Sequence, residues 1–251
     1  MGHSPKIDAT SGLGIGILGL ILRFLSTHDE IMPEKIAASI INVTGSDAFD
    51  FLQGQLSNDL RLLEDKPTLL TAWCNPKGRV ICLTNLTRTA GGYDFAVPTE
   101  IADEIVSRLT MFRFRAKVDF EIGASKTSAD PSEAIHSGIP FIGREQSEKF
   151  TPHMLNLDLL GAISFDKGCY TGQEIVARTH YKGATRRRTL RFTSAEPLAA
   201  GDKVSDGKRD IGEVLNTAGL DLLAVIPLDK ADGDLTVNGI TLTRQSLPYL
   251  S

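Results

Sequence analysis

Eight consecutive residues, 167–174, hold the side chains whose types and spacing point most directly to chemistry: Lys-Gly-Cys-Tyr-Thr-Gly-Gln-Glu. Thr171 and Glu174 stand three residues apart and precede an apolar pair, which is the pattern of a helix capping box. A helix that begins there places Cys169 beside unpaired backbone N–H groups, and the charge of Lys167 further favours a thiolate. The run therefore predicts catalytic roles for Cys169 and Lys167. The alternative is that Cys169 is a small buried apolar residue and that the glycines only turn the chain.

Composition places the chain among ordinary globular proteins. It has 251 residues, 41% hydrophobic content and a net charge of -4, so no excess of basic charge points to nucleic acid. Its three cysteines are Cys74, Cys82 and Cys169, and none stands in a C-x-x-C pair. This argues against a disulfide scaffold and a closed zinc site, and no metal is expected. Such thiols fit a reducing compartment, so we expect a cytoplasmic protein.

The N-terminal residues carry an apolar run over 13–25, in which Arg23 is the only charged side chain. The run is too short for a bilayer, which needs about 20 apolar residues, and the flanking residues do not fit a signal peptide. We therefore expect no membrane contact and interpret residues 1–31 as a mobile or loosely docked leader, with Met32 as an alternative start. The spacing Gly14-x-Gly16-x-x-Gly19 matches a dinucleotide fingerprint, but no strand precedes it.

A helix is predicted after the first buried strand, which we place at residues 38–43. Apolar residues recur on one face of this helix at spacings of three and four: Phe49, Leu52, Leu56 and Leu60. Amide and carboxylate side chains near its end either lie on the surface or line a ligand pocket. Asn58 and Asp59 are the candidates for cofactor binding in this segment.

Further strands and a second helix complete the predicted sheet. Residues 68–74 and 79–86 form a hairpin, because Asn75-Pro76-Lys77-Gly78 supplies the proline and glycine of a tight turn. Residues 93–97 extend the hairpin to a meander. In the helix that follows, Ile101, Ile105 and Leu109 repeat every four positions, and this face is expected to cover the sheet.

Basic and apolar residues alternate over 113–122, which predicts a half-buried strand with Arg113, Arg115 and Lys117 on one face. This face is either a solvated edge or an anion-binding wall, so Arg113 and Arg115 are candidate ligand-binding residues. The polar, aperiodic residues 123–133 are predicted to form a loop. From Pro140 to Asn156 we expect no regular element.

The helix that follows the cysteine is predicted to run from Gly172 to about Tyr181, with Gly183 as its C-terminal cap. Basic residues gather around its end and in the next segment: Arg178, Lys182, Arg186, Arg187 and Arg188. Cations are favoured at a helix C-terminus in any case. Beyond that, the cluster is a candidate contact for tRNA, or for the phosphate or carboxylate of a small ligand.

Short strands without helices fill the chain from Thr189 onward. Asn238-Gly239 between two runs of β-forming residues is the strongest hairpin signal in the sequence. Evenly spaced short strands predict a small barrel or sandwich. We therefore expect an α+β domain over residues 32–184 and a β domain over 185–251. The cysteine motif lies close to their junction, where ligand pockets preferentially occur.

The cysteine motif is part of a longer run that resembles the signature of the YgfZ family. These proteins are folate-binding relatives of the glycine-cleavage T-protein that support iron–sulfur enzymes. The run reads Pro152-x-x-x-Asn156-Leu157-x-x-Leu160-Gly161-x-Ile163-Ser164-Phe165-x-Lys167-Gly168-Cys169-Tyr170-Thr171-Gly172-Gln173-Glu174. Looser matches include Val43-Thr44-Gly45, Lys77-Gly78 and Leu247-Pro248-Tyr249, so the resemblance covers the chain from about Ala38 onward.

The resemblance implies a fold and a function. The fold is α+β, with a shortened T-protein-like folate-binding domain followed by a small C-terminal antiparallel β barrel. The function is that of a monomeric folate-binding accessory protein for assembly or repair of iron–sulfur clusters, and through it for tRNA-modifying enzymes. Tetrahydrofolate is the implied cofactor, Cys169 the functional thiol, and iron–sulfur proteins or their assembly machinery the partners. The candidate cofactor-binding residues are Asn58, Asp59, Arg113, Arg115, His136, Tyr170, Gln173, Glu174 and Arg178.

Two departures from the family pattern concern folate. Only about thirty residues separate Phe120 from Pro152, where bacterial relatives carry many more, and His136 occupies the place of a glutamate that recognises the pterin in the T-protein. Two other functions stay open. One is a tetrahydrofolate-dependent aminomethyl or one-carbon transferase, for which Asp59 is the candidate acid–base group. The other is a tRNA-binding module. The sequence leaves undecided whether the protein is an enzyme.

Overall fold

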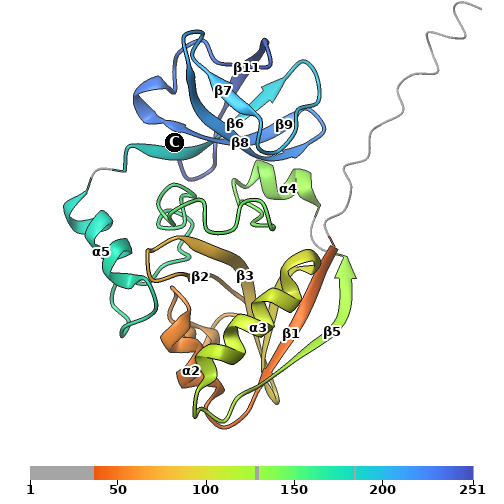
Figure 1. The fold of residues 1–251 in the computed structure, drawn as a ribbon, viewed down its shortest axis with the longest axis vertical. Helices are drawn as coiled ribbons and strands as arrows, with labels where there is room; N and C mark the ends of the chain where they lie inside the picture. The colour runs from red at the N-terminus through yellow and green to blue at the C-terminus, as the bar shows by residue number, and fades with distance from the viewer. Residues whose placement is uncertain (1–36, 128–129, 184, 251) are drawn as a thin grey trace, which may run out of the picture. The chain divides into compact units, whose positions relative to one another are not determined.

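The first half of the chain is built on a five-stranded antiparallel sheet in the order β2-β3-β4-β1-β5 (Figure 1). Its strands are β1 Ala37–Thr44, β2 Leu69–Cys74, β3 Val80–Thr89, β4 Gly92–Pro98 and β5 Asp119–Thr127. The computed structural model describes residues 37–127, 130–183 and 185–250. The leader predicted for residues 1–31, with its glycine pattern, lies outside the described residues.

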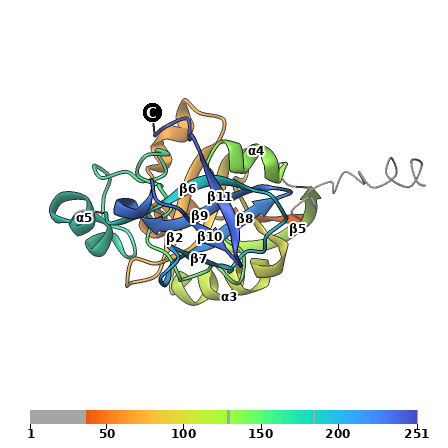
Figure 2. The ribbon, with the colours of Figure 1, turned by 90° about the horizontal axis from the view of Figure 1, so that it is seen from above.

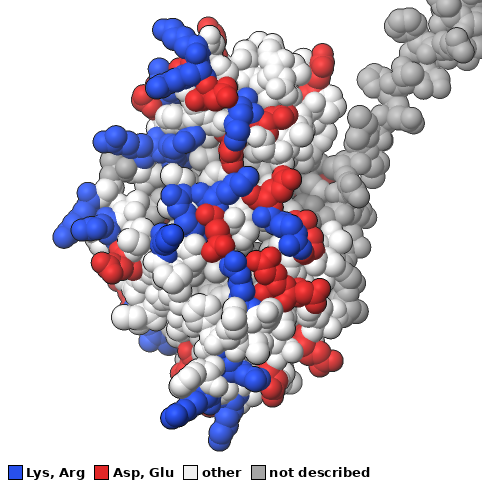
Figure 3. Space-filling view, in the orientation of Figure 1, with Lys and Arg blue, Asp and Glu red and all other residues white. Residues whose placement is uncertain are grey.

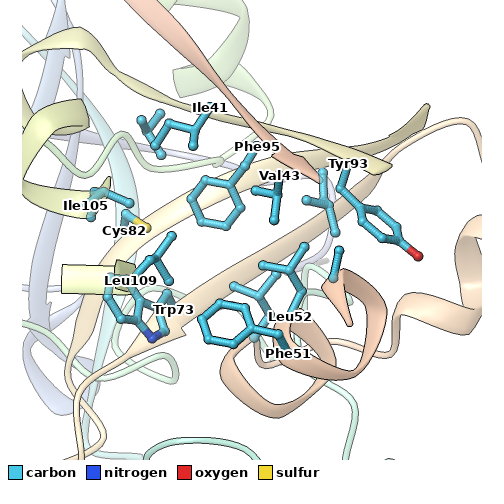
Figure 4. Close-up of a cluster of buried hydrophobic side chains, with 14 of the residues drawn as sticks. Ile41, Val43, Phe51, Leu52, Trp73, Cys82, Tyr93, Phe95, Ile105 and Leu109 are labelled. Carbon is cyan, nitrogen blue, oxygen red and sulfur yellow. The ribbon is translucent and has the colours of Figure 1, made fainter. Parts of the chain in front are cut away.

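Two helices cover one face of the sheet, α2 Ala48–Gln55 and α3 Ala102–Arg113, and a 3-10 turn, η2 Thr99–Ile101, leads into α3. Between helices and sheet lies a core of buried side chains, to which the strands contribute Trp73 and Phe95 and α3 contributes Ile105 and Leu109 (Figure 4). The predicted hairpin, the third strand and the apolar face of α3 are therefore confirmed.

The first helix is shorter than predicted. α2 ends at Gln55, Leu56 forms an isolated bridge with Trp73, and a separate 3-10 helix, η1, spans Leu60–Glu64. Phe49 is 37% exposed, whereas Phe51 is buried and packs against Phe120 of β5 with ring centroids 5.6 Å apart. The predicted apolar face is therefore wrong at Phe49, because contacts with the sheet select a different side of a short helix.

The strand predicted over 113–122 is present only from Asp119 onward, and the loop predicted over 123–133 is wrong. α3 runs through Arg113 and ends at Phe114, which has a φ of 48°. β5 begins only at Asp119, pairs with β1 and runs to Thr127, and a further helix, α4, spans Pro131–His136. The carboxylate of Asp130 caps α4 by accepting a hydrogen bond from the backbone N–H of Ser132 at 2.9 Å. Arg113 and Arg115 therefore do not share a strand face.

The last part of the chain is a closed barrel in the order β10-β11-β6-β9-β8-β7, seen from above in Figure 2. Its strands are β6 Arg187–Ser194, β7 Lys203–Ser205, β8 Asp210–Ala218, β9 Asp221–Pro227, β10 Thr236–Val237 and β11 Ile240–Gln245, with the 3-10 turn η3 Leu228–Lys230 between β9 and β10. Asn238 and Gly239 form the predicted hairpin turn with φ of 51° and 83°. The predicted barrel is confirmed.

A second core joins the sheet, the barrel and the segment between them. Residues 139–165 form turns without a helix or strand, as predicted for Pro140 to Asn156, and bury Leu155, Leu157 and Ile163. These side chains pack in one cluster with Ala72 of β2 and Leu223 of β9. Helix α5, Gln173–Lys182, follows and lies to one side of the barrel strands in both views (Figures 1 and 2). Among the described residues, no helix has the length and apolar character needed to cross a membrane.

Candidate functional site

Lys167 anchors the motif loop, residues 167–172, to the end of α2. Its side chain is buried, and its ammonium donates hydrogen bonds to the backbone carbonyls of Gln53 (2.6 Å), Leu56 (2.6 Å) and Asn58 (3.0 Å). A lysine ammonium has three N–H donors, so all of them are used. The carbonyls at the C-terminal end of a helix lack helical partners and favour a cation. The cation therefore stabilises the end of α2 and fixes the loop against it.

The surroundings of this ammonium are aromatic and largely shielded from water. It lies 5.2 Å from the centroid of the Tyr170 ring, within the range of a cation–π contact. Burial lowers the pKa of Lys167 to about 8, although the charge of Asp59 acts in the opposite direction. Because its donors are committed to backbone carbonyls, Lys167 positions the loop. Its catalytic role stays a prediction.

The residues after Cys169 pack against the β2–β3 turn. Gly172 is the N-cap residue of α5 with a φ of 84°, and a Cβ atom there would lie 2.5 Å from the carbonyl oxygen of Asn75. Gly78 in the turn has a φ of 67°, and a Cβ atom there would lie 2.9 Å from Cβ of Ile175. Both positions require glycine because of the backbone conformation and the close approach.

The predicted capping box at the start of α5 is wrong, although the helix itself is confirmed. No side chain caps the helix, which begins at Gln173. The hydroxyl of Thr171 donates instead to the side-chain carbonyl of Gln55 at 3.1 Å, and its backbone N–H donates to the carbonyl of Gly54 at 3.3 Å. The contact with α2 therefore replaces the local cap. The predicted end of the helix is close, because Gly183 is its C-cap residue.

The three cysteines lie in contrasting environments. Cys169 is exposed in the motif loop, whereas Cys74 and Cys82 are buried in the sheet. Burial raises the pKa of Cys74 to about 12 and also raises the pKa of Cys82. Thiols buried in apolar surroundings are inert. Because Cys169 is exposed, the alternative that it is a small buried apolar residue is wrong.

Asn58 and Asp59 are engaged within the fold. The buried amide of Asn58 donates hydrogen bonds to the carbonyls of Leu70 (2.9 Å) and Gly161 (2.8 Å). The hydrogen bonds of Arg61 hold the pKa of the Asp59 carboxyl well below its usual range. A carboxylate held ionised in this way is a weak general base. The contact of both residues with a cofactor stays a prediction.

The predicted basic cluster divides into side chains that are committed to the fold and side chains that face solvent. Arg188 forms two hydrogen bonds of 2.9 Å with the carboxylate of Asp158, and both side chains are mostly buried. Arg187 donates to the carbonyl of Ile211 at 2.5 Å. The remaining members, Arg178, Lys182 and Arg186, are exposed. Basic side chains are visible along the left edge of the molecule, over α5, in Figure 3.

A mostly apolar pocket of about 270 Å³ lies on the sheet face opposite α2 and α3. Its floor is formed by side chains of β1 to β4 that alternate along the strands with those of the first core: Ala38, Leu70, Leu83, Asn85, Ala96 and Pro98. Its walls are α4 and the segment Ile139-Pro140-Phe141. Glu133 of α4 is the only charged residue that lines it.

None of the nine predicted cofactor-binding residues lines this pocket. Asn58, Asp59, Tyr170 and Gln173 lie around the motif loop, where Gln173 accepts a hydrogen bond from the backbone N–H of Tyr170 at 3.3 Å. Glu174 and Arg178 are exposed on α5. The structure therefore gathers four of the nine at the motif.

The other predicted residues lie elsewhere. Nε2 of His136, at the end of α4, lies 3.4 Å from the carboxylate of Asp221 in the barrel. Arg113 pairs with Asp119 at 3.2 Å, and the Arg115 guanidinium lies over the Phe114 ring, 5.4 Å from its centroid. The grouping of Arg113 and Arg115 into an anion-binding wall was wrong because the chain there is a helix end and a turn.

Glu133 and Asn85 are pocket residues that the sequence pattern did not single out. Glu133 fell in a segment predicted to be a loop. The signal that would have found α4 is the pair Asp130-Pro131, an N-cap residue followed by proline at the first helical position.

The sequence of the chain is similar to two groups of known proteins. Residues 186–248 match the family model described as CAF17, C-terminal beta-barrel domain. A tRNA-modifying protein YgfZ from Edwardsiella ictaluri is 29% identical over 295 residues, which cover 83% of this chain and 89% of the relative. A protein of the same name from Klebsiella pneumoniae is 28% identical over 259 residues, which cover 73% of this chain and 79% of the relative. These matches support the resemblance of this chain to the YgfZ family.

This chain is shorter than the Edwardsiella relative. The alignment with the Edwardsiella protein spans 295 residues, more than the 251 of this chain, so the relative carries stretches that this chain lacks. The match with the YgfZ protein of Hamiltonella defensa is 26% identical over 219 residues and covers 59% of this chain and 65% of that relative, just under two thirds of its length.

The fold is similar to that of a glycine cleavage system aminomethyltransferase T from Bartonella henselae. The TM-score is 0.64 at 14% sequence identity, and the match covers 87% of this chain and 88% of the other. At this identity the likeness concerns the fold alone. The predicted T-protein-like α+β fold with a C-terminal barrel is confirmed.

The thiols of this chain should differ sharply in reactivity. We expect iodoacetamide to alkylate Cys169 in the native protein and to leave Cys74 and Cys82 unmodified, because only the thiolate of an accessible cysteine reacts. Peptide mass spectrometry after a timed reaction measures the modification at each site. Unfolding in urea should make all three react, and a Cys169→Ser variant should not react when native. Labelling of Cys74 at the rate of Cys169 would contradict the structure.

Proposed function

We propose that this member of the YgfZ family is a folate-binding accessory protein that supports assembly or repair of iron–sulfur clusters and, through it, tRNA-modifying enzymes. Relatives that carry the name tRNA-modifying protein YgfZ support the link to tRNA. The resemblance of the cysteine motif to the family signature supports the link to iron–sulfur proteins. The proposed partners are iron–sulfur proteins or their assembly machinery, and the proposed location is the cytoplasm.

The observation that carries the proposal is the exposure of Cys169 on a loop that is otherwise firmly held. Lys167 and Tyr170, on either side of it, are buried, and Gly172 is pressed against the β2–β3 turn. The thiol is therefore presented to solvent from a fixed position. Such a thiol can act as a nucleophile, as a transient metal ligand or as a redox group. Among the described residues there is no group of three metal-binding side chains, which favours a transient role over a resident metal site.

The apolar pocket on the sheet fits the ring system of tetrahydrofolate. Its volume of about 270 Å³ is slightly below the range of about 300–1,000 Å³ that is usual for ligand pockets, so it would hold a two-ring system whose tail continues outward. Apolar side chains from the sheet and Phe141 would contact the ring faces, while Glu133 and Asn85 would hold its polar edge. When bound, tetrahydrofolate would carry one-carbon units. The residues of this chain would bind and orient the tetrahydrofolate.

The fold of an aminomethyltransferase makes a one-carbon transferase the second candidate. Its predicted acid–base group, Asp59, is tied to Arg61 and Gln53 by hydrogen bonds, which weakens this alternative. The tRNA-binding alternative retains only Arg178, Lys182 and Arg186, because Arg187 and Arg188 are committed within the fold. We therefore favour the accessory role.

The proposal predicts that Cys169→Ala abolishes function and leaves the fold intact. In a host from which the gene has been deleted, plasmid-borne wild-type protein should restore the activity of iron–sulfur enzymes. The Cys169→Ala variant should leave the activity at the level of the deletion strain, because the exposed thiol makes no contact that the fold needs.

The control is Lys208→Ala, a change of an exposed side chain on the barrel, which should restore activity as the wild type does. Immunoblots and thermal denaturation should show equal amounts and stability of the variants. Full rescue by Cys169→Ala would refute the assignment of the functional thiol.

A further inference from the structure

Four aromatic rings form a cluster at the end of helix α5. The rings of Phe165 and His180 are stacked, with centroids 3.7 Å apart and planes inclined by 17°. The ring of Tyr181 lies edge-on to both, 4.8 Å from His180 and 6.1 Å from Phe165. His153 completes the cluster, 6.1 Å from His180. The cluster therefore anchors the last turn of α5 to the segment that precedes the motif loop.

Anchoring the helix accounts for the inner rings of this cluster but not for Tyr181. His153 is only 2% exposed, and Phe165 is partly buried. Tyr181, by contrast, is 67% exposed, and among the described residues no hydrogen bond engages its hydroxyl. Tyrosine is enriched at interfaces, because its ring offers a large contact area with a polar end. The exposed ring of Tyr181 is therefore a candidate contact for a ligand.

Three exposed cations accompany this ring. Arg178 and Lys182 stand four residues apart on α5, and Tyr181 stands three residues after Arg178, so the three side chains share one face of the helix. Arg186 follows shortly after the helix ends. Within the described part of the chain, none of the three cations forms an ion pair. They are therefore available to the anionic groups of a ligand.

The helix dipole explains part of this charge but not the whole surface. Cations are favoured at the C-terminal end of a helix, but the dipole gives no reason for an exposed ring among them. The acidic residue of α5, Glu174, lies in its first turn, about 12 Å along the axis from Lys182. The second half of α5 is therefore positively charged, although the whole chain carries a net charge of -4. In Figure 3, basic side chains with uncharged surface between them lie along this edge of the molecule.

An exposed ring between unpaired cations fits the chemistry of unpaired nucleotides. A base presents a flat π-face that stacks on an aromatic ring, and the phosphates on either side of it attract cations. An acidic peptide would use the cations alone. A duplex would do the same, because its base faces are covered by its own stacking. The combination of ring and cations therefore favours a single strand.

We infer that the second half of α5 binds the unpaired nucleotides of a single-stranded nucleic acid, with a base stacked on Tyr181 and the neighbouring phosphates bound by the three cations. His180 holds the ring of Tyr181 from one side, and the stack on Phe165 holds His180. None of these residues lines the apolar pocket, and the contact does not use Cys169. It adds a second binding surface to the proposed accessory role and does not depend on folate.

The test is fluorescence anisotropy of labelled oligonucleotides with the full-length protein. The probes are oligouridine RNA, oligothymidine DNA and a DNA duplex, each about 12 nucleotides long, which is within the range of site sizes of single-strand binding surfaces. The wild type should bind the single strands more tightly than the duplex. The logarithm of its association constant should fall with the logarithm of salt concentration at a slope of about -2, because three phosphates are contacted. The tighter of the two single strands identifies RNA or DNA as the source of the nucleotides.

Three variants separate stacking from charge. Tyr181→Ala should weaken binding of the single strands roughly 5- to 100-fold and change duplex binding by less than about twofold, because only a single strand offers a base to stack. Tyr181→Phe keeps the ring and should bind as the wild type does. Replacing all three cations, Arg178, Lys182 and Arg186, with glutamine should remove most of the salt dependence.

The matched control is Phe114→Ala, which removes another exposed ring beside an arginine, at the end of α3, and should bind every probe as the wild type does. Equal affinity of wild type and Tyr181→Ala for the single strands would overturn the inference. So would equal affinity of the wild type for single strands and duplex, or absence of binding at low salt. Thermal denaturation verifies that Tyr181→Ala is folded, and titration with tetrahydrofolate tests the proposed function separately.

Discussion

Replacing Lys167 with methionine is expected to destabilise the protein by about 2–4 kcal/mol, the largest effect that we predict for a single side chain. Methionine fills a similar volume but donates no hydrogen bond. The carbonyls of Gln53, Leu56 and Asn58 then lose a donor in a region that water reaches poorly. Each unsatisfied buried polar group costs about 1–3 kcal/mol, and removal of the cost of burying the charge offsets part of this. Urea unfolding measures the difference. If the free energy of unfolding falls with urea at the same slope in both proteins, the loss of stability lowers the urea concentration at the unfolding midpoint.

The control for this prediction is Lys182→Met, which replaces an exposed lysine at the end of α5 and should change stability by less than about 0.5 kcal/mol. The dependence on pH gives a second readout. Burial lowers the pKa of Lys167 from its ordinary value of 10.5 to about 8 in the folded chain, so the stability of the wild type should rise with pH between about 8 and 10.5 and level off on either side. Lys167→Met should lack this rise. Equal unfolding midpoints of wild type and Lys167→Met would show that the carbonyls do not need the ammonium.

Replacing Gly172 with alanine is expected to have the second largest effect, a loss of about 2–3 kcal/mol. The added Cβ atom would lie 2.5 Å from the carbonyl oxygen of Asn75, and the φ of 84° strains any residue with a side chain. The β2–β3 turn and the start of α5 would have to separate. Because this contact fixes the loop that carries Cys169, the position of the thiol should change as well.

The matched control is Gly168→Ala in the same loop. A Cβ atom on Gly168 would have no neighbour within 4 Å, and its φ lies outside the left-handed range, so stability should be nearly unchanged. Urea unfolding compares the two variants with the wild type. The account of the loop would be contradicted if Gly172→Ala were as stable as Gly168→Ala.

The sequence predicted correctly those elements that depend mainly on residues close together in the chain. The tight turn at Asn75–Gly78 and the Asn238-Gly239 hairpin each depend on neighbouring residues, and both are present. The apolar spacing of Ile105 and Leu109 predicted the buried face of α3. The short strands of the barrel were likewise predicted from their even spacing in the sequence.

The predictions that failed depend on contacts distant in sequence. Thr171 has the spacing of a capping residue, but Gln55 lies 116 positions away in the sequence and receives its hydroxyl in the fold. The three carbonyl partners of Lys167 are 109 to 114 positions away in the sequence. Local spacing does not reveal them, and it led instead to the prediction that the lysine charge acts on the neighbouring thiol. Basic and apolar residues alternate after Arg113 in a pattern that is typical of a strand. In the fold, however, this segment is a helix end and a turn.

The pocket itself could not be predicted, because its parts come from four strands, α4 and the segment after it. His136 lies on α4, which is a wall of the pocket, but His136 does not line the pocket. Glu133 of the same helix is among the lining residues and is exposed.

The most direct test of this account is a calorimetric titration of the wild-type protein with tetrahydrofolate. We predict saturable binding of one molecule per chain, and protection of pocket residues such as Phe141 and Glu133 in a parallel hydrogen-exchange measurement. Absence of binding heat at the highest soluble concentration of tetrahydrofolate, with the protein folded, would contradict the central proposal that this chain has a folate pocket.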